Sequence, residues 1–262
     1  MHEAKKHKGA MLGFLLRLQG VNPVKLQGPF LYGHFLERPN RFLTVCQLNG
    51  RKVLAYMPNP GPMPDLLHPG VEVLLRHNPG IHRKTDYDLV CSRSNGAMLS
   101  LDSRVPNWLL AEVLPLRQLA PFSQYQEIIP EPVYRTSRLD FCLRNETLPT
   151  CYIEAKSSTD TRQSIGLFPR VPTERGQRHV QELMHAVDEG FRAAIVFIVQ
   201  RTDAAKMKPN DPIDPEFGTI LRKAVNYGVE AYAWTTRFIE PTCEIIIDRE
   251  IPVDLSPPLT ID

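Results

Sequence analysis

The sequence predicts a two-part protein, with a small β-barrel or sandwich over residues 28–92 and an α/β layer fold over 93–262. Short strand-like runs separated by turn residues, without helical periodicity, indicate the first part. Strands that alternate with two well-delimited helices after residue 120 indicate the second. The composition agrees, because 42% hydrophobic and 23% charged residues are ordinary for a globular chain of 262 residues.

Residues 1–27 are predicted to form a basic N-terminal arm outside both parts. Its opening "MHEAKKHKGA" is polar, and the apolar run "MLGFLLRLQGV" that follows is too short to span a membrane and contains Arg17. The five cysteines form no Cys-x-x-Cys pair, and we expect no signal peptide before them. We therefore expect buried thiols in a cytoplasmic protein without a membrane partner.

The strand candidates of the first part are separated by turn residues, and Asn49-Gly50 is the strongest hairpin signal. They read "PFLYGHFLE", "RFLTVCQLNGRKVLAYM", "VEVLLRHN" and "DYDLVCS". The segment 57–70 carries five prolines and is predicted to be an ordered surface loop that either shapes a groove or connects strands rigidly. A small barrel with basic loops can bind single-stranded nucleic acid, although such loops are commonly just solvated surface.

The second part is predicted to begin with a short helix within 104–120. Asn107 would begin this helix, Pro115 would break it, and Glu112 would lie on it. Helix-capping residues and runs of apolar residues predict the central helices and strands of this second part.

The clearest helix is "TERGQRHVQELMHAVDEG", with Thr173 as N-cap, and a polar loop is expected before it over 157–172. The continuously apolar strand 192–201 should be central and buried on both faces. A second helix is capped by Asp214 and closed by Gly228, and the strand "VEAYAWTT" follows it.

Residues 135–158 predict a hairpin whose charges need an explanation. Period two places Asp140 on one face of the first strand, with Glu154 and Lys156 on the matching face of the second. If the strands pair, the carboxylates converge, and a hard cation such as magnesium would offset their repulsion. The Ala155 carbonyl could add an oxygen ligand, and Lys156 could assist an attacking water or stabilise a phosphate. The plainer alternative is a solvated face with a Glu154–Lys156 ion pair.

These motifs resemble those of known families. A strand ending in Asp, a strand with Glu-x-Lys, a helix and a buried strand resemble the PD-(D/E)XK nuclease core. The stretches "SRLDF", "CYIEAKS", "FPRVPTERGQRHVQEL" and "DYDL" after "RK" are similar to the sugar fermentation stimulation protein family, SfsA, over about residues 28–253. The resemblance implies an N-terminal OB-like β-barrel, a C-terminal PD-(D/E)XK nuclease-like α/β domain, and non-specific DNA binding.

The resemblance also implies roles for individual residues. Asp140, Glu154 and Lys156 fall on the nuclease motif as catalytic residues, and Gln177 lies in the following helix, where such cores often carry a polar site residue. Mg²⁺ or Mn²⁺ would bind Asp140, Glu154 and the backbone carbonyl of Ala155, with Glu112 as an additional acid. The proline-rich loop departs from the family pattern Pro-Asn-Thr-Gly-Arg, because "PNPGPM" replaces a hydroxyl and a basic residue there.

The candidate nucleic-acid contacts are basic residues in loops, beside the hairpin or at a helix N-terminus, where phosphates are favoured. A net charge of only +2 means that such a surface must be local. The candidates are Arg51, Lys52, Arg83, Lys84, Arg138, Arg175 and Arg178.

Three functional hypotheses follow. The first is a non-specific DNA-binding protein and metal-dependent nuclease that hydrolyses phosphodiester bonds. The second is a DNA-binding regulator of sugar metabolism whose nuclease-like scaffold does not cleave, since fold alone does not decide activity. The third is an RNA-processing factor, because an OB-like barrel does not separate RNA from DNA. No helix-turn-helix or zinc motif predicts base readout, and an oligomer is compatible with the sequence.

Overall fold

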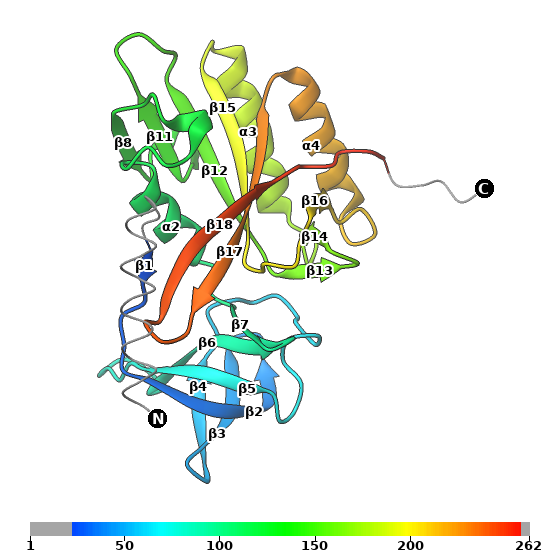
Figure 1. The fold of residues 1–262 in the computed structure, drawn as a ribbon. Helices are drawn as coiled ribbons and strands as arrows, with labels where there is room; N and C mark the ends of the chain where they lie inside the picture. Colours follow the sequence, from blue (N-terminus) through cyan, green and yellow to red (C-terminus); the bar gives the residue numbers. More distant parts are fainter. Residues whose placement is uncertain (1–22, 258–262) are drawn as a thin grey trace, which may run out of the picture. The chain divides into compact units, whose positions relative to one another are not determined.

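The computed structural model describes residues 23–257, which divide into two compact units (Figure 1). The first unit contains Pro23–Val105 and Arg237–Ile246, and the second contains Pro106–Thr236 and the residues from Ile247. The predicted boundary at residues 92 and 93 therefore shifts, because a further strand pairs with the end of the barrel and keeps residues 93–105 in the first unit.

The first unit is an OB-like barrel. Its strands are β2 (Phe30–Asn40), β3 (Leu43–Leu48), β4 (Arg51–Tyr56), β5 (Glu72–His77), β6 (Tyr87–Ser94) and β7 (Ala97–Ser100). The strands follow the order β4-β3-β2-β5-β6, and the barrel closes because β4 also pairs in parallel with β6. Strand β7 pairs in antiparallel fashion with β6. The predicted hairpin is confirmed, since Asn49 and Gly50 join β3 to β4 with φ angles of 49° and 79°.

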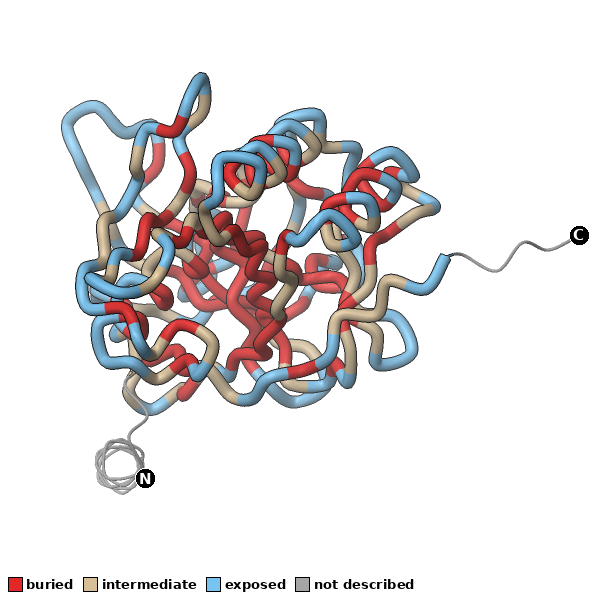
Figure 2. Tube along the Cα trace, turned by 90° about the horizontal axis from the view of Figure 1, so that it is seen from above, coloured by how far each residue is buried: buried red, intermediate tan, exposed pale blue. Residues whose placement is uncertain are grey.

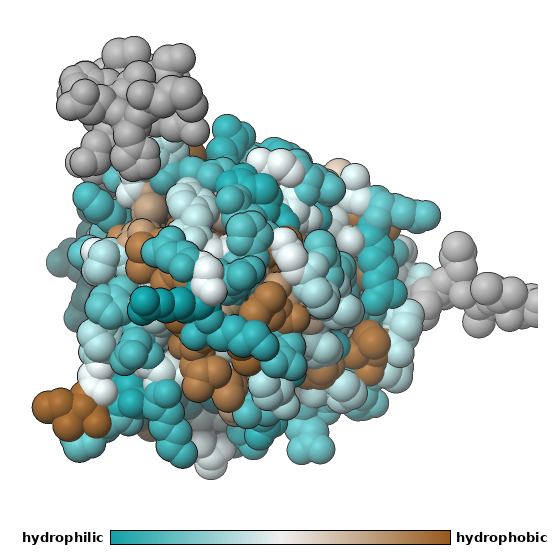
Figure 3. Space-filling model, turned by 90° about the horizontal axis from the view of Figure 1, so that it is seen from below, coloured by the Kyte–Doolittle hydropathy of each residue, from teal (hydrophilic) through white to brown (hydrophobic). Residues whose placement is uncertain are grey.

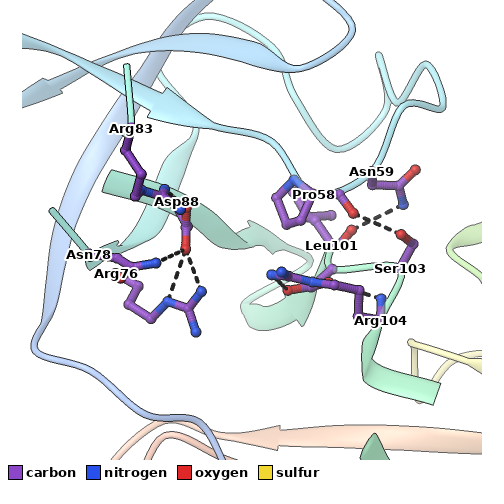
Figure 4. Close-up of polar contacts among 10 residues, drawn as sticks. Pro58, Asn59, Arg76, Asn78, Arg83, Asp88, Leu101, Ser103 and Arg104 are labelled. Carbon is purple, nitrogen blue, oxygen red and sulfur yellow. Dashed lines mark hydrogen bonds and ion pairs between the residues drawn. The ribbon is translucent and has the colours of Figure 1, made fainter. Parts of the chain in front are cut away.

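The proline-rich segment 57–70 is an ordered part of the barrel unit. Its apolar side chains join the barrel core. The Asn59 amide donates to the Leu101 carbonyl at 3.0 Å, and the Ser103 hydroxyl donates to the Pro58 carbonyl at 2.8 Å (Figure 4). The segment is therefore fixed by the barrel, and it connects β4 to β5.

The second unit is built on a mixed sheet in the order β18-β17-β15-β12-β11-β8, of which Arg237–Ile246, the end of β17 and the start of β18, belongs to the first unit. The sheet strands are β8 (Glu127–Pro130), β11 (Phe141–Arg144), β12 (Cys151–Ser158), β15 (Arg192–Val199), β17 (Glu230–Ile239) and β18 (Glu244–Ile251). Strands β12, β15 and β17 are parallel neighbours. The helices are α2 (Val105–Val113), η1 (Ala120–Phe122), α3 (Glu174–Asp188) and α4 (Pro215–Tyr227).

Helices α3 and α4 pack side by side against the parallel strands (Figure 1). Their buried side chains meet those of β15 in one core, which Figure 2 shows as the buried centre of the unit. The predicted ends of both helices are confirmed: Thr173 and Asp214 accept hydrogen bonds as N-caps, and Gly228 ends α4 at a φ of 118°. The central, buried position predicted for residues 192–201 is confirmed by β15.

The expected loop over 157–172 was wrong in part. Short strands β13 (Asp160–Arg162) and β14 (Ile165–Phe168) form a small sheet with β16 (Lys206–Pro209). Strand β13 has three residues and β14 has four, which is too short for a period-two pattern to reveal them. A further two-residue ladder joins β9 (Val133–Tyr134) to β10 (Ser137–Arg138), just before the site hairpin.

Most of the predicted basic arm lies outside the described residues. Strand β1 (Val24–Lys25) pairs with the start of β18, inside the first unit. The five cysteines are free thiols, and Cys243 is the partly exposed one of them. Between residues 23 and 257, no helix is long and apolar enough to cross a membrane.

Candidate active site

Asp140 immediately precedes β11 and lies opposite Glu154, which belongs to β12. The hairpin register pairs Phe141 with Ile153, and the Asp140 N–H donates to the Ile153 carbonyl at 3.1 Å. One residue further along, the side chains of Asp140 and Glu154 therefore fall on the same face of the sheet. The sheet brings together the two carboxylates that the sequence predicted, with Lys156 two residues on.

Asp140 is held by two donors in an otherwise unfavourable environment. The Ala155 N–H donates to Oδ2 at 2.7 Å, and the Asn107 amide on α2 donates to Oδ1 at 2.6 Å. Burial and the charge of Glu154 nevertheless raise the pKa of Asp140 to about 6. A carboxylate kept ionised here would gain from a nearby cation.

Glu154 is the more strongly held acid. Its Oε1 accepts from Lys156 Nζ at 2.6 Å and contacts His179 Nδ1 on α3. Burial alone would raise the pKa of Glu154, but Lys156 and His179 together hold it below its ordinary value. The other oxygen, Oε2, is buried without a hydrogen-bond partner, which costs about 1–3 kcal/mol when nothing compensates it.

The tautomer of His179 follows from its second neighbour. The Arg175 guanidinium, which can only donate, contacts His179 Nε2 at 3.3 Å. Nε2 is then the unprotonated nitrogen, and Nδ1–H donates to Glu154 Oε1. His179 and Lys156 thus occupy one oxygen of Glu154 and leave the other unpaired.

Burial argues against the alternative of a solvated ion pair. Glu154 is 3% exposed and Lys156 is 9% exposed, so neither lies on a water-covered face. A buried charge pair gives little stability for its own sake and is common at functional sites.

These residues fit a divalent cation. Two hard carboxylates and the unpaired, buried Oε2 of Glu154 are suitable oxygen donors, and magnesium needs only one or two carboxylates because it keeps several waters. Among the residues described, no cluster of three or more His, Cys, Asp or Glu side chains could hold a metal. The remaining ligands would therefore be water, substrate oxygens and backbone carbonyls, of which Ala155 remains a prediction.

The other two predicted site residues, Gln177 and Glu112, form no hydrogen bond with Asp140 or Glu154. The Gln177 amide donates to Asp214, the N-cap of α4, at 2.9 Å, so it ties the two helix starts together. Glu112 is exposed near the end of α2. Asn107, which contacts Asp140, is five residues earlier on the same helix. This spacing places Glu112 on a different side of α2 from Asn107.

His179 and Asn107 are contacts that the sequence interpretation missed. His179 falls on the buried stripe of α3 with Leu183 and Ala186, so a polar residue on a core-facing stripe was the available signal. Asn107 was interpreted as opening its helix, but α2 starts at Val105, and the Asn107 side chain is free to reach Asp140.

The predicted nucleic-acid contacts of the second unit are exposed. Arg175 and Arg178 lie in the first turns of α3, and Arg175 also touches His179. Arg138 forms an ion pair with Glu131 at 3.1 Å that is open to water on both sides. A surface pair of this kind contributes little to stability and would be available to a phosphate.

Arg83 has a structural contact that its loop position did not predict. Asp88 on β6 is buried, and its carboxylate accepts from Arg76, Asn78 and Arg83 (Figure 4). These donors hold the pKa of Asp88 below its ordinary value, although burial acts in the opposite direction. Lys84, like Arg51 and Lys52, is exposed.

Arg83 and Lys84 should therefore respond differently to substitution. We expect Arg83→Ala to lower the free energy of unfolding by about 1–3 kcal/mol, because Asp88 loses a charged donor in a buried site. Lys84→Ala should change it by less than about 0.5 kcal/mol. Urea unfolding of both variants checks this, and equal stability of the two would show that the Asp88 network does not depend on Arg83.

Comparisons with known proteins agree with this architecture. Residues 36–101 match the family model "SfsA N-terminal OB domain", and residues 104–241 match "Sugar fermentation stimulation protein RE domain". A "Sugar fermentation stimulation protein homolog" of Moorella thermoacetica is 43% identical over 226 residues, which cover 85% of this chain and 97% of that protein. The homolog of Alkaliphilus metalliredigens is 39% identical over 229 residues, with coverages of 87% and 99%.

A solved structure, that of Pyrococcus furiosus SfsA in complex with Ca²⁺, is similar at a TM-score of 0.78 and 28% sequence identity. The match covers 88% of this chain and 99% of that one. The predicted fold class, an OB-like barrel followed by an α/β domain, is confirmed.

Proposed function

Because the chain belongs to the sugar fermentation stimulation protein (SfsA) family, we propose that it is a DNA-binding protein that hydrolyses phosphodiester bonds with a divalent metal. The observation that carries the proposal is the buried Asp140–Glu154 pair, in which Glu154 Oε2 has no partner and Asp140 has a raised pKa. The related P. furiosus protein was solved in complex with Ca²⁺, which supports a divalent cation here.

The residues of the site would have distinct roles in the reaction. Asp140 and Glu154 would hold the cation, with the Ala155 carbonyl beside them. The cation, Mg²⁺ or Mn²⁺, would supply polarisation of the scissile phosphate and a water of lowered pKa. Lys156 Nζ lies beside Glu154 and would orient the attacking water or stabilise charge that develops on the phosphate oxygens.

His179 and Asn107 would act as positioning residues. His179 holds Glu154 Oε1 through Nδ1–H, which fixes the orientation of that carboxylate. Asn107 and the Ala155 N–H do the same for Asp140. Arg175 and Arg178 on the first turns of α3 would contact the phosphate backbone, where the helix N-terminus also favours negative charge.

The barrel supports the nucleic-acid part of the proposal, because OB barrels commonly bind oligonucleotides. Contacts to phosphate by lysine and arginine carry no sequence information, so we expect binding that is indifferent to sequence and weakens steeply with salt.

The test is incubation of the pure full chain with single-stranded, duplex and branched DNA and with RNA, each with Mg²⁺, Mn²⁺ or EDTA. Cleavage that needs metal supports the proposal, and the preferred substrate identifies its class. Metal-dependent thermal stabilisation without cleavage of any substrate would instead favour the DNA-binding regulator that uses the same fold as a scaffold.

The raised pKa of Asp140 predicts a pH dependence of metal binding. Below about pH 6 a proton competes with the cation for Asp140, so the apparent Mn²⁺ affinity should fall toward tenfold per pH unit, whereas it should level off above pH 7. The stability of the metal-free protein should depend on pH in the opposite direction to the Mn²⁺ affinity. The pKa of Asp140 in the folded protein lies above its ordinary value of 3.8, so its contribution to stability is present below that value and is lost as pH rises through about 6.

Calorimetric titration of Mn²⁺ at several pH values between 5 and 8 measures the dependence. Glu146→Gln removes an exposed carboxyl from a distant loop and serves as the control, with an unchanged profile. An affinity that is the same at pH 5 and pH 7.5 would exclude Asp140 as a ligand.

A further inference from the structure

The barrel carries a surface hollow of about 470 Å³, within the size range of small-ligand sites. Strands β3 and β4 and the two loops beside them form it. Its lining residues are Asn40, Phe42, Leu43, Leu54, Tyr56, Arg83, Lys84 and Thr85. On the face drawn in Figure 3, apolar side chains reach the surface in small groups among hydrophilic ones.

Apolar and aromatic side chains face water in this hollow. Phe42 is 41% exposed and Leu54 is 46% exposed. The rings of Phe42 and Tyr56 lie within 15° of parallel, with centroids 6.3 Å apart. Strand alternation explains the arrangement, since Val53 and Ala55 point into the barrel core and leave Leu54 and Tyr56 on the outer face. An exposed aromatic group of this kind indicates a binding surface.

The position of Phe42 is fixed by its backbone. Its N–H donates to Asn40 Oδ1 at 2.9 Å, and its carbonyl accepts from the Met57 N–H at 2.9 Å. The ring is therefore presented by a rigid turn between β2 and β3, and little ordering would be needed when a ligand binds.

The charge around the rings is positive. The Arg41 guanidinium lies 5.0 Å from the centroid of the Phe42 ring, and exposed Lys84 lines the other side of the hollow. The lining contains no Asp or Glu. Arg83, the other cation of the lining, is already engaged by Asp88. Aromatic faces bordered by lysine and arginine suit a nucleobase with its phosphate.

We infer that this hollow binds unpaired nucleotides of a single-stranded nucleic acid, with a base stacked on Phe42 and Tyr56 and the phosphate near Lys84 and Arg41. OB barrels bind oligonucleotides on their second and third strands and on the adjoining loops. In this barrel β3 and β4 are the second and third strands, and they line the hollow together with their neighbouring loops. The inference deepens the proposed function, on which it rests, because it assigns the unpaired part of the substrate to the barrel.

The test is fluorescence anisotropy of labelled dT15, the RNA rU15 and a blunt duplex, with the full chain in EDTA at one salt concentration. Phe42→Ala should weaken binding of both single strands about 10-fold, the loss of one stacked base, and change duplex binding by less than about 2-fold. Comparison of dT15 with rU15 shows which single strand binds more tightly. Phe42→Trp should restore affinity, and its added indole fluorescence should be quenched by dT15.

Ile81→Ala is the matched control, since Ile81 is a fully exposed apolar residue of the same unit outside the lining, and it should leave all affinities unchanged. Unchanged affinity of Phe42→Ala for single strands, or an unquenched Phe42→Trp, overturns the inference even if cleavage is observed. Conversely, Phe42-dependent binding of single strands in a chain that neither binds metal nor cleaves supports this site and refutes the proposed hydrolysis.

Discussion

Replacing Lys156 by Met is expected to reduce metal-dependent cleavage about 100- to 1,000-fold without loss of metal binding. The substitution keeps the side-chain volume but removes the charge beside the reacting phosphate, and loss of one electrostatic contact to a transition state has an effect of this size. Glu154 loses its closest cation, so the metal-free protein should melt at a lower temperature. The stabilisation by Mn²⁺ should be retained or increased, because the cation then compensates Glu154.

The control for this variant is Lys223→Met, which removes an exposed lysine of α4 and should change neither cleavage nor melting. Lys156→Arg separates charge from shape, because it keeps a cation but not the compact ammonium group. Cleavage by folded, metal-bound Lys156→Met at more than about a third of the parent's rate would exclude a catalytic role for Lys156.

Asp140→Asn is expected to abolish cleavage and metal stabilisation while leaving the metal-free fold intact. The amide oxygen can still accept from the Ala155 N–H, and its NH₂ group can donate to Asn107 once the Asn107 amide turns over. The substitution also removes the repulsion between Asp140 and Glu154. The variant without metal should therefore melt at the parent's temperature or a few degrees above it.

A thermal melt of parent and Asp140→Asn in EDTA measures this, with Glu146→Gln as an exposed-carboxyl control. A variant that melts far below the parent without metal would show that Asp140 is mainly a structural acceptor for Ala155 and Asn107. Undiminished cleavage by Asp140→Asn would remove it from the active site.

Local signals explain why much of the fold could be predicted. Thr173 and Asp214 mark helix starts because their side chains satisfy the first backbone N–H groups, and that chemistry is readable from a few adjacent residues. Asn49-Gly50 likewise fixes a turn within the segment that contains it. The hairpin with Asp140 and Glu154 was readable because period two specifies which side chains share a face.

The contacts that could not be predicted link residues far apart in the chain. His179 reaches Glu154 across 25 positions, and Asn107 reaches Asp140 across 33. No local propensity encodes either pairing, since both depend on how α3 and α2 pack on the sheet. Arg83 was interpreted as a free loop cation because its partner Asp88 is an ordinary strand residue in the sequence, and its burial appears only when the barrel closes.

The central claim is that Asp140 and Glu154 together hold a divalent metal, and calorimetric titration of the full chain with Mn²⁺ at pH 7.5 tests it most directly. We expect saturable Mn²⁺ binding by the parent at this pair, retained binding by Lys156→Met, and no binding by Asp140→Asn. Absence of Mn²⁺ binding by the parent up to several millimolar, or equal binding by Asp140→Asn, would contradict the claim.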